Sequence, residues 1–330
     1  MRKVTIEDIS RQTGLSRGTV SRALNNRPDI SLQTKQRVLE ACRQLKYVPS
    51  HAARALATGR RYAIAVAVDD LRSYFAASYL RGAAKRAADD GYAVLVFELG
   101  ADPRAAVEGM CTMVAERVDG LLLGTVLPNP LLSQVRSALE NRVLVTGDVA
   151  VATAWDTFAP DHVEAGRLVA RHLLRANQTD VLYVYQPGTA EVESRLAGFR
   201  EVCAEYGVNA EQATIAVETT QPDPLGPLRA RLGSLRAVIG DTDVLAVNLM
   251  LLALECGRRP GRDIAVAGVG NDPIGAHVHP SLTTVDLCGE EIGRRAMEIA
   301  IQRITKARQD APQHTLVAPV LIPRDSSRIA

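Results

Sequence analysis

The 330-residue sequence has few cysteines and no long apolar run. Its five cysteines are scattered, odd in number and never spaced as Cys-x-x-Cys. This usage is typical of reduced, mostly buried thiols and disfavours a disulfide framework or a metal site. No apolar run is long enough to cross a bilayer, and the N-terminus lacks the apolar core of a signal peptide. The sequence therefore predicts a cytoplasmic protein without a membrane partner.

Motifs of common enzyme classes are also absent. The sequence contains no Gly-x-Ser-x-Gly elbow, no phosphate-binding Gly-x-x-x-x-Gly-Lys string and no metal-type spacing of His and Cys. His277 and His279 are interpreted as loop residues, and His162 as a residue at a helix start. We therefore predict no catalytic site, no metal and no cofactor.

Charge is present but unevenly distributed. The net charge is +2, yet residues 1–61 hold 13 Lys and Arg against 4 Asp and Glu, which leaves 26 basic and 33 acidic residues in the remainder. A basic head on a mildly acidic body is typical of a nucleic-acid binder. The alternative is a solvated basic face without a partner.

The basic N-terminal stretch has the pattern of short helices. Thr5 precedes the helix-compatible run Ile6–Thr13, and Asp8 stands three residues on, where a capping partner belongs. After a Gly-Leu break, Ser16 can cap a second helix, Arg17–Asn25. Two short helices joined by a glycine-containing turn predict a helix-turn-helix. In that motif the N-terminal residues of the second helix reach base edges in the major groove.

A third helix is expected from Leu32 to Leu45, capped by Ser31. It can pack on the first two helices through an apolar face. That face is predicted to consist of Val38, Leu39, Cys42 and Leu45.

Strings along the whole chain resemble the lactose-repressor family of bacterial regulators. The resemblance begins in the helical head, continues through a hinge and recurs in the body. The matching strings are Val4-Thr5-Ile6-Glu7-Asp8-Ile9, Gly14-Leu15-Ser16, Thr19-Val20-Ser21-Arg22-Ala23-Leu24-Asn25, Tyr47-Val48-Pro49, Ala53-Arg54-Ala55-Leu56, Arg195-Leu196-Ala197-Gly198-Phe199, Thr242-Asp243-Val244-Leu245-Ala246, Pro280-Ser281-Leu282-Thr283-Thr284-Val285 and Leu321-Ile322-Pro323-Arg324-Asp325-Ser326.

The resemblance implies operator DNA as a partner. Arg17, Gly18 and Arg22 are candidates for reading bases, because arginine can bind guanine bidentately. Many relatives carry a longer side chain at the position of Gly18. Arg17 and Arg22 are therefore expected to make more of the contacts to DNA bases. Hydroxyl and amide side chains suit phosphate contacts, although each could serve only as a helix cap. These candidates are Thr5, Ser16, Thr19, Ser21, Asn25 and Ser31.

Residues 49–61 are predicted to be a hinge and linker. The resemblance implies that Pro49–Ala57 becomes helical only on DNA, where two copies pair in the minor groove. Ser50 and Ala53 belong to this segment, and Leu56 would wedge between base pairs and kink the duplex. The segment is short, and short isolated helices are marginal in water.

From residue 62 the pattern changes to apolar strands alternating with helices, which predicts parallel sheets. The expected fold is a small all-α helix-turn-helix head (1–48) plus hinge, followed by an α/β periplasmic-binding-protein-like body (62–330). Its two parallel-sheet subdomains are predicted at 62–160 with 288–316, and at 161–287 with 317–330. The expected strands are Ala63–Val68, Ala93–Leu99, Gly120–Val126, Val143–Gly147, Val181–Tyr185, Thr214–Val217, Ala237–Ile239, Ile264–Val269 and the strand-like Thr315–Ile322; the expected helices are Ala76–Gly91, Arg104–Arg117, Leu131–Glu140, Val163–Arg175, Val192–Tyr206, Pro224–Leu232, Val244–Cys256 and Gly289–Thr305.

The resemblance implies a small effector between the subdomains, and ligands of open α/β sheets bind at the loops that follow strands. Arg195 is the first candidate, because the arginine of this family motif binds effector hydroxyls or an acid group; the alternative is a surface salt bridge. Phe158 is either an apolar wall of the site or a core residue. The full candidate set is Arg72, Tyr74, Phe75, Asp148, Phe158, Arg195, Thr242, Gly270 and Asn271.

The effector is expected to be a sugar or sugar phosphate. Gly270 stands where relatives often carry an acid, whereas Arg72 and Arg195 are kept, which favours an anion. Gly270-Asn271-Asp272-Pro273 and His279-Pro280 resemble the trehalose-repressor branch, whose effector is trehalose 6-phosphate. We therefore predict a homodimeric regulator. Repression is the usual outcome in the family, and activation is the alternative. The alternative is a stand-alone periplasmic-type sugar-binding protein.

Overall fold

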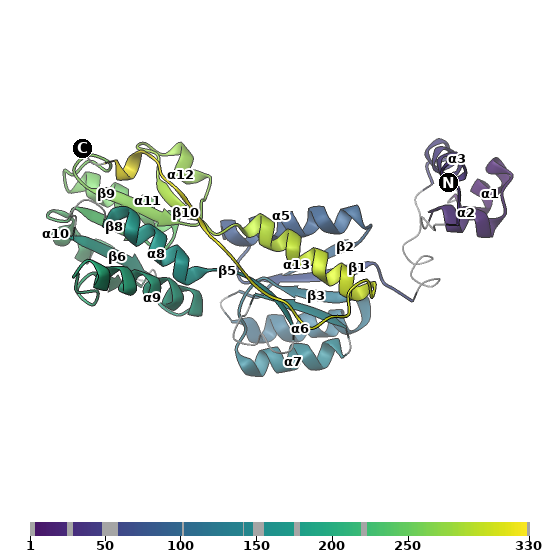
Figure 1. Ribbon diagram of the computed structural model, residues 1–330, viewed down its shortest axis with the longest axis horizontal. Helices are drawn as coiled ribbons and strands as arrows, with labels where there is room; N and C mark the ends of the chain where they lie inside the picture. Colours follow the sequence, from purple (N-terminus) through teal and green to yellow (C-terminus); the bar gives the residue numbers. More distant parts are fainter. Residues whose placement is uncertain are drawn as a thin grey trace. The chain divides into compact units, whose positions relative to one another are not determined.

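The computed structural model describes residues 4–24, 29–47, 59–100, 102–140, 142–147, 155–174, 179–218 and 223–328. The chain divides into two compact units, residues 1–62 and residues 63–330 (Figure 1). Among the described residues, no helix is long and apolar enough to cross a membrane.

The first unit contains α1 (Ile6–Thr13), α2 (Arg17–Leu24) and α3 (Leu32–Gln44). Its helices begin at the expected caps: the Thr5 backbone N–H donates to the Asp8 carboxylate at 2.9 Å. The Ser16 and Ser31 hydroxyls accept from backbone N–H groups in the first turns of α2 and α3. A small core closes between the three helices, and its buried members are Ile9, Val20, Ala23, Val38, Ala41 and Cys42.

One prediction for α3 was wrong. Leu39 was expected on the apolar face of this helix, but its side chain is 47% exposed. The buried positions are Val38, Ala41 and Cys42, with Leu45 partly buried beside them. This spacing of three and four residues forms one stripe of a helix, and Leu39 lies about 100° away from that stripe.

The second unit begins with a sheet of six strands in the order β11-β5-β4-β3-β1-β2, and every neighbouring pair is parallel. We call it sheet A. Its strands are β1 (Ala63–Val68), β2 (Ala93–Glu98), β3 (Gly120–Leu123), β4 (Val143–Thr146), β5 (Asp156–Pro160) and β11 (His314–Val317). Helices α6 (Pro103–Arg117) and α7 (Asn129–Leu139) pack on one face, and α5 (Tyr74–Asp89) and α13 (Gly289–Ile304) cover the other (Figure 1).

A second six-stranded sheet, sheet B, has the order β12-β10-β9-β8-β6-β7. Its strands are β6 (Val181–Tyr185), β7 (Thr214–Ala216), β8 (Ala237–Gly240), β9 (Ala265–Val269), β10 (Thr283–Asp286) and β12 (Val320–Ile322). Only β12 runs antiparallel to its neighbour among the described strand pairs. The helices of this half are α8 (His162–Leu173), α9 (Ala190–Glu205), α10 (Arg229–Leu232), α11 (Asp243–Glu255) and α12 (Ile274–His277).

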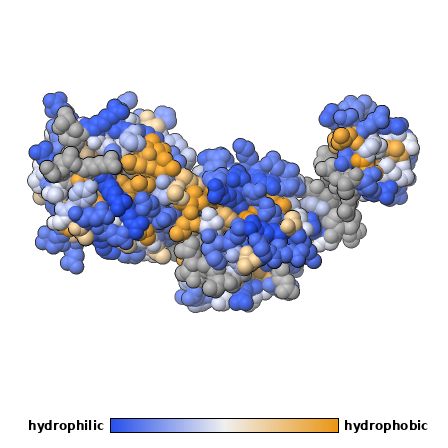
Figure 2. Space-filling model, viewed as in Figure 1, coloured by the Kyte–Doolittle hydropathy of each residue, from blue (hydrophilic) through white to orange (hydrophobic). Residues whose placement is uncertain are grey.

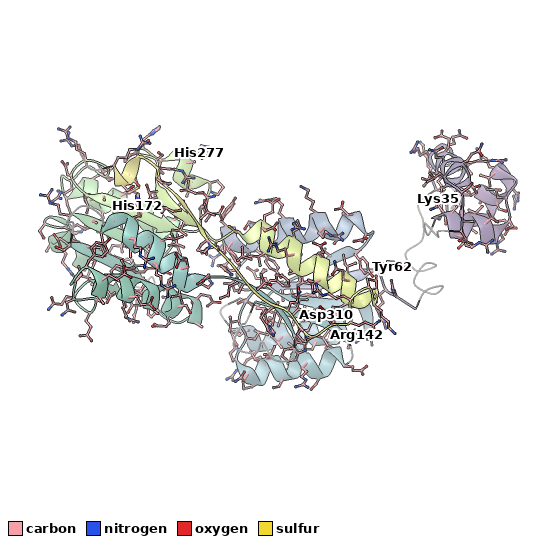
Figure 3. The ribbon with its side chains drawn as sticks, viewed as in Figure 1. Lys35, Tyr62, Arg142, His172, His277 and Asp310 are labelled. Carbon is pink, nitrogen blue, oxygen red and sulfur yellow. The ribbon has the colours of Figure 1, made fainter. Side chains whose placement is uncertain are left out.

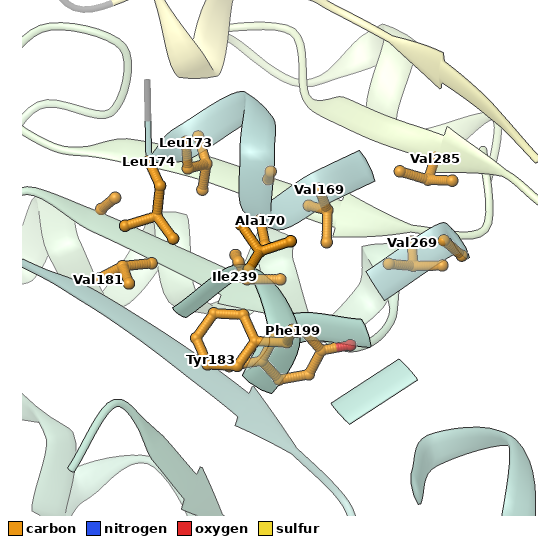
Figure 4. Packing of buried hydrophobic residues seen from close by; sticks show 14 of the residues in the cluster. Val169, Ala170, Leu173, Leu174, Val181, Tyr183, Phe199, Ile239, Val269 and Val285 are labelled. Atoms are coloured by element: carbon orange, nitrogen blue, oxygen red, sulfur yellow. The ribbon is translucent and has the colours of Figure 1, made fainter. Parts of the chain in front are cut away.

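Sheet B is stabilised by a core on each face. The α8 and α9 side contains the rings of Tyr183 and Phe199, whose centroids lie 5.0 Å apart (Figure 4). The α11 side contains Leu249 and Met250 against Val238. Burying a side chain of this size contributes about 1.5 to 3 kcal/mol, so both faces of the sheet are fixed against their helices.

The chain passes three times between the two halves. Strand β5 leads into α8, β10 leads into α13, and β11 leads into β12. Since β5 and β10 both end at a passage, the carboxyl-terminal edges of both sheets face these crossovers. In open parallel sheets, ligands bind at that edge.

Several expected elements differ from the structure. The strand-like run Thr315–Ile322 is two strands, β11 and β12, which belong to different sheets. The expected helix Pro224–Leu232 is a 3₁₀ turn, Gly226–Leu228, followed by the short α10. Strands β5 and β10 and helix α12 were missed. Their sequences are short, and both strands contain aspartate and threonine instead of an apolar run.

Glycines bring one helix pair of each half into close contact. A Cβ on Gly82 of α5 would lie 1.9 Å from the carbonyl oxygen of Glu290 in α13. In the other half, a Cβ on Gly198 of α9 would lie 1.9 Å from the carbonyl oxygen of Val163 in α8. Both pairs therefore need glycine, because any side chain would push the helices apart.

A buried ion pair holds the segment between α13 and β11. The Arg303 guanidinium donates to Asp156 at the start of β5, with both distances 2.9 Å. It also contacts the carboxylate of Asp310 at 3.1 Å (Figure 3). The backbone N–H of Gln313 donates to the same Asp156 carboxylate at 2.9 Å. The chain is thereby fixed where it enters the edge strand of sheet A.

Candidate nucleic-acid interface and effector site

The proposed base-reading residues lie on the surface of the first unit. Arg17, Gly18 and Arg22 are all exposed on α2. Arg17 is 3.7 Å from Glu7, and Arg22 is 3.7 Å from Asp29. Such long, solvent-exposed pairs contribute little free energy. Both guanidinium groups can therefore exchange these partners for bases or phosphates.

The phosphate candidates cluster at helix starts. Thr5, Ser16 and Ser31 precede α1, α2 and α3, and all three are exposed. Ser16 also exchanges a hydrogen bond with the Thr19 hydroxyl at 2.9 Å, and Ser21 is half-buried. Thr5, Ser16 and Ser31 are thus caps, a role compatible with phosphate binding. The candidates Asn25, Ser50, Ala53 and Leu56 lie outside the described residues.

Arg195 occupies a buried position in the second unit. It lies on α9, and only 7% of the residue is exposed. Its Nε donates to Asp241 Oδ1 at 2.8 Å, and its Nη2 donates to Asp241 Oδ2 at 2.6 Å. Burial opposes the charged guanidinium, but the hydrogen bonds and charge of Asp241 outweigh it and raise the pKa of Arg195. Arg195 therefore forms a salt bridge, but a buried and bidentate one instead of the surface pair that was the alternative.

Two further side chains complete this cluster. The Tyr183 hydroxyl donates to Asp241 Oδ1 at 2.6 Å. His162 Nδ1 lies 3.0 Å from Arg195 Nη1. Because arginine can only donate, Nδ1 must accept and the imidazole proton must sit on Nε2. Burial, helped by the charge of Arg195, lowers the pKa of His162 to about 3. His162 is thus a neutral imidazole at the start of α8.

Arg72 lies in the loop after β1 and is far more exposed. Its side chain is 90% exposed and binds the neighbouring Asp70 bidentately, at 3.0 Å from Nε and 2.8 Å from Nη2. Hydrogen bonds from Arg72 lower the pKa of Asp70. The guanidinium remains open to solvent on its outer side.

The aromatic candidates Tyr74 and Phe75 lie at the start of α5. The guanidinium of Arg81 stacks over the Tyr74 ring at 5.9 Å from its centroid. Phe75 is partly buried and packs against the sheet B core described above, although it belongs to the sheet A half. Phe75 therefore connects the two halves.

The other candidates have different environments. Phe158 is only 5% exposed within β5, which favours its core alternative. Thr242 is exposed and caps α11, accepting from the Leu245 N–H at 3.2 Å. Asp148 lies outside the described residues.

Gly270 and Asn271 follow β9. Gly270 has φ of +133°, a conformation that side chains rarely adopt. An acid at this position would therefore strain the backbone of this loop. Asn271 uses its amide in hydrogen bonds to Asp286 and Arg324.

The sequence reasoning did not single out Asp241 or Tyr183. Asp241 directly follows β8, so the rule that ligand residues follow strands could have found it. Tyr183 is inside β6 and fully buried, and its pattern is that of a core residue.

His277 and His172 have structural partners: His277 Nδ1 contacts the Pro273 carbonyl at 2.7 Å, and His172 Nε2 contacts Ser327 at 2.7 Å (Figure 3).

Other potential sites in the described parts of the chain are weak. No group of three or more His, Cys, Asp and Glu side chains there could hold a metal ion. A surface hollow of about 320 Å³ lies between α5 and α13. It is lined by Gly82, Lys85, Arg86, Asp89, Glu290, Glu291 and Arg294. Its charges of both signs favour no particular ligand.

Two family descriptions match the chain. Residues 5–50 match bacterial regulatory proteins of the lacI family, and residues 170–327 match a periplasmic binding protein-like domain. The regulator DegA of Bacillus subtilis is 26% identical over 335 residues, covering 98% of each chain. The repressor PurR of Escherichia fergusonii is 26% identical over 331 residues, covering 98% of this chain and 96% of its own.

Solved structures share the fold. The lac repressor dimer bound to operator and the anti-inducer ONPF has a TM-score of 0.78 at 23% identity and full coverage of both chains. The regulator CelR in complex with cellobiose has a TM-score of 0.72 at 22% identity, covering 98% of this chain and all of that one.

A helix-turn-helix unit followed by two joined α/β halves defines a class, the DNA-binding regulators with a periplasmic-binding-protein-like body. Residues 5–50 carry the regulatory domain of the lacI family of bacterial regulatory proteins, and the relatives DegA and PurR, which match over 98% of the chain, are transcriptional regulators. The chain is therefore a DNA-binding transcriptional regulator and not an enzyme.

Proposed function

We propose that this protein binds pseudo-palindromic operator DNA as a homodimer and that a small sugar-type effector sets its affinity. Residues 1–48 are assigned to DNA, 49–61 to a hinge and 62–330 to effector binding and dimerisation. The observation that carries the effector proposal is the buried Arg195–Asp241 pair at the carboxyl-terminal edge of sheet B. Repression is the proposed outcome of DNA binding, as in the repressor PurR.

The second copy is proposed to cover α11. This helix exposes Val244, Leu251 and Leu254 at 58%, 54% and 47%, with half-buried Val247 between them. Their spacing of three to four residues makes one apolar stripe. Figure 2 shows hydrophobic surface on the half of the body that contains sheet B. A two-fold operator requires two heads, so a copy of this chain is the occupant that fits.

The buried cluster suits hydroxyl groups. The positive charge of Arg195 is matched by Asp241, so the pair is neutral overall. Together the groups offer donors and acceptors, which are what sugar hydroxyls need. Arg72 is the residue that could bind a phosphate, because its outer side is open to solvent. A sugar phosphate such as trehalose 6-phosphate would thus place its phosphate near Arg72 and its sugar hydroxyls at the sheet B cluster.

DNA binding is tested by fluorescence anisotropy on a pool of palindromic duplexes with a central CG step, at two salt concentrations. The wild type should select a subset of duplexes. Arg17→Ala should weaken binding to that subset by about 1 to 3 kcal/mol and reduce discrimination. Arg43→Ala is the matched control, because it removes an equal charge from exposed α3. Wild-type binding without any selection at either salt would contradict the proposal.

The effector class is tested by thermal shift with neutral disaccharides and their phosphates, including trehalose and trehalose 6-phosphate. Stabilisation by the phosphate alone, lost in Arg72→Ala, would support the phosphorylated effector. Stabilisation by the neutral sugar alone would exclude the phosphate and keep the sugar. No stabilisation by any sugar would contradict the sugar-type effector.

A further inference from the structure

The crossover from sheet B to α13 is short and held by one carboxylate. Strand β10 ends at Asp286 and α13 begins at Gly289, so two residues connect them. The backbone N–H of Cys288 donates to Asp286 Oδ1 at 2.7 Å. Cys288 itself has φ of +57°, a left-handed conformation that is uncommon outside glycine. The Asp286 side chain thus fixes the turn into α13.

The other oxygen of Asp286 is bound by Asn271, which follows β9. Asn271 Nδ2 donates to Asp286 Oδ2 at 3.1 Å, and Asn271 Oδ1 accepts from Arg324 Nη2 at 2.9 Å. The orientation of the amide is unambiguous, because a guanidinium can only donate and a carboxylate only accepts. Arg324 is anchored in turn by the Leu282 carbonyl at 2.7 Å.

The same hydrogen-bond chain continues to the proposed effector loops. The backbone N–H of Asn271 donates to Thr284 Oγ1 at 3.1 Å, and that hydroxyl donates to Asp243 Oδ1 at 2.6 Å. Asp243 is 2% exposed and also accepts from the Asp272 backbone N–H at 2.6 Å. It stands two residues after Asp241, the partner of Arg195. The loops after β8 and β9 are therefore tied to each other and to the crossover.

Beyond the crossover, the start of α13 has no room to move independently. A Cβ on Gly289 would lie 2.2 Å from the Ser78 hydroxyl and 3.0 Å from the Phe75 carbonyl oxygen, both in α5. A shift at Asp286 must therefore carry α13 and α5 together, since packed helices do not deform continuously. Helix α5 follows directly on the loop that carries Arg72.

We propose that Asn271 is a positioning residue that fixes the crossover into α13 through Asp286, so that ligand contact at the loops after β8 and β9 is transmitted to the α5–α13 pair. This inference rests on the proposed function for its regulatory meaning. Its structural part, the control of the crossover by Asn271, stands on the hydrogen bonds alone. Asn271 then acts through the protein and not as a direct ligand of the effector.

The test exchanges the two partners. Asn271→Asp places two carboxylates against each other, whereas the double variant N271D/D286N restores one amide and one carboxylate with their positions swapped. Arg324 can still donate to position 271, and the new amide oxygen at 286 can still accept from Cys288. Hydrogen exchange of residues 287–292 in the full-length protein is the readout. Asn129→Asp is the matched control, because it adds the same charge at an exposed residue of α7.

Asn271→Asp should speed exchange in this segment by about tenfold or more, the effect of one lost hydrogen bond. The double variant should return to within about threefold of wild type, and the control should not change. Asn271→Gly is the milder variant, because glycine tolerates the φ of +53° at this position and loses only the side chain. Unchanged hydrogen exchange in both single variants would overturn the proposal. It would also be overturned if residues 287–292 exchanged as fast in N271D/D286N as in N271D.

The failure of this inference can be separated from failure of the proposed function. Selective operator binding by the wild-type protein tests the function without any substitution at 271. If the wild type is selective and the exchange results are negative, the regulator remains and the Asn271 connection is lost. If the exchange results are positive and operator binding is unselective, the connection is real but does not control DNA.

Discussion

Two arginine–aspartate pairs in this protein have nearly the same geometry and very different environments. Arg195 and Asp241 form a bidentate pair whose side chains are 8% and 4% exposed. Arg72 and Asp70 form a bidentate pair whose side chains are 90% and 36% exposed. Desolvation makes the buried pair rigid and interdependent, whereas water competes for the exposed pair. The first pair is thus part of the structure that shapes the site, and the second can exchange its partner for a ligand.

The largest expected effect comes from removing one charge of the buried pair. Asp241→Ala leaves the Arg195 guanidinium buried and uncompensated, so the free energy of unfolding should fall by about 3 to 5 kcal/mol. Urea denaturation measures this change. Asp70→Ala is the matched control and should leave the unfolding midpoint unchanged. Equal effects of the two substitutions would remove the distinction between the pairs.

The neutral imidazole of His162 gives the buried cluster a dependence on pH. Its folded pKa of about 3 lies below the ordinary value of 6.5. Below pH 6.5 the unfolded chain binds a proton that the native protein does not bind. Stability should therefore fall as pH decreases from 6.5 towards 3, by at most about 1.4 kcal/mol per pH unit.

The buried carboxyl of Asp243 changes stability with pH in the opposite direction. The pH dependence of the wild type must therefore be compared with that of a variant that lacks His162. Burial raises the pKa of Asp243 to about 6, despite the hydrogen bond from Thr284. Its contribution to stability is present at low pH and lost as pH rises through 6. Urea denaturation between pH 5 and 7 should show a stronger loss towards low pH in wild type than in His162→Asn. Parallel curves would exclude His162 as the source.

A smaller effect is expected at Tyr183. Tyr183→Phe removes the hydrogen bond to Asp241 and keeps the ring packing against Phe199. The free energy of unfolding should fall by about 1.5 to 3 kcal/mol, as for a hydrogen bond to a charged group. Thermal denaturation would detect this change. A fully neutral result would show that Asp241 does not depend on the hydroxyl.

The smallest effect on stability is expected at Arg72. Arg72→Ala should leave the unfolding midpoint unchanged, because the side chain is almost fully exposed. Its binding of a phosphorylated sugar should weaken, and the binding of the neutral sugar should stay the same. Calorimetric titration with both sugars makes the comparison. Equal loss for both would place Arg72 against sugar hydroxyls instead of a phosphate.

Much of the fold follows from local pattern. The expected bounds of β1 and β6 coincide with those observed, because an apolar run between turn signals marks a buried parallel strand. Strands β5 and β10 escaped this rule, since their buried aspartate and threonine side chains are satisfied by partners distant in sequence. Thr284, for example, donates to Asp243, 41 residues away.

The candidate site was also predictable only in part, because some of its residues follow a local sequence pattern and others do not. The Arg195 motif and the strand-end rule predicted candidates in helix α9 and in the loops that follow β8 and β9. The partner Asp241 and the structural use of the Asn271 amide depend on contacts across 46 and 15 residues, which no local pattern encodes. The expectation of an anionic effector rested on Arg72 and Arg195, whose charges are matched in the structure by the carboxylates of Asp70 and Asp241.

The most direct test of this account is the effect of a stabilising sugar on operator affinity. Anisotropy titrations on the selected duplex would be made with and without trehalose or trehalose 6-phosphate, whichever raises the melting temperature. We expect a change in the operator Kd of about fivefold or more, the usual range of coupling between two sites. A sugar that stabilises the protein while leaving the operator Kd unchanged would contradict it.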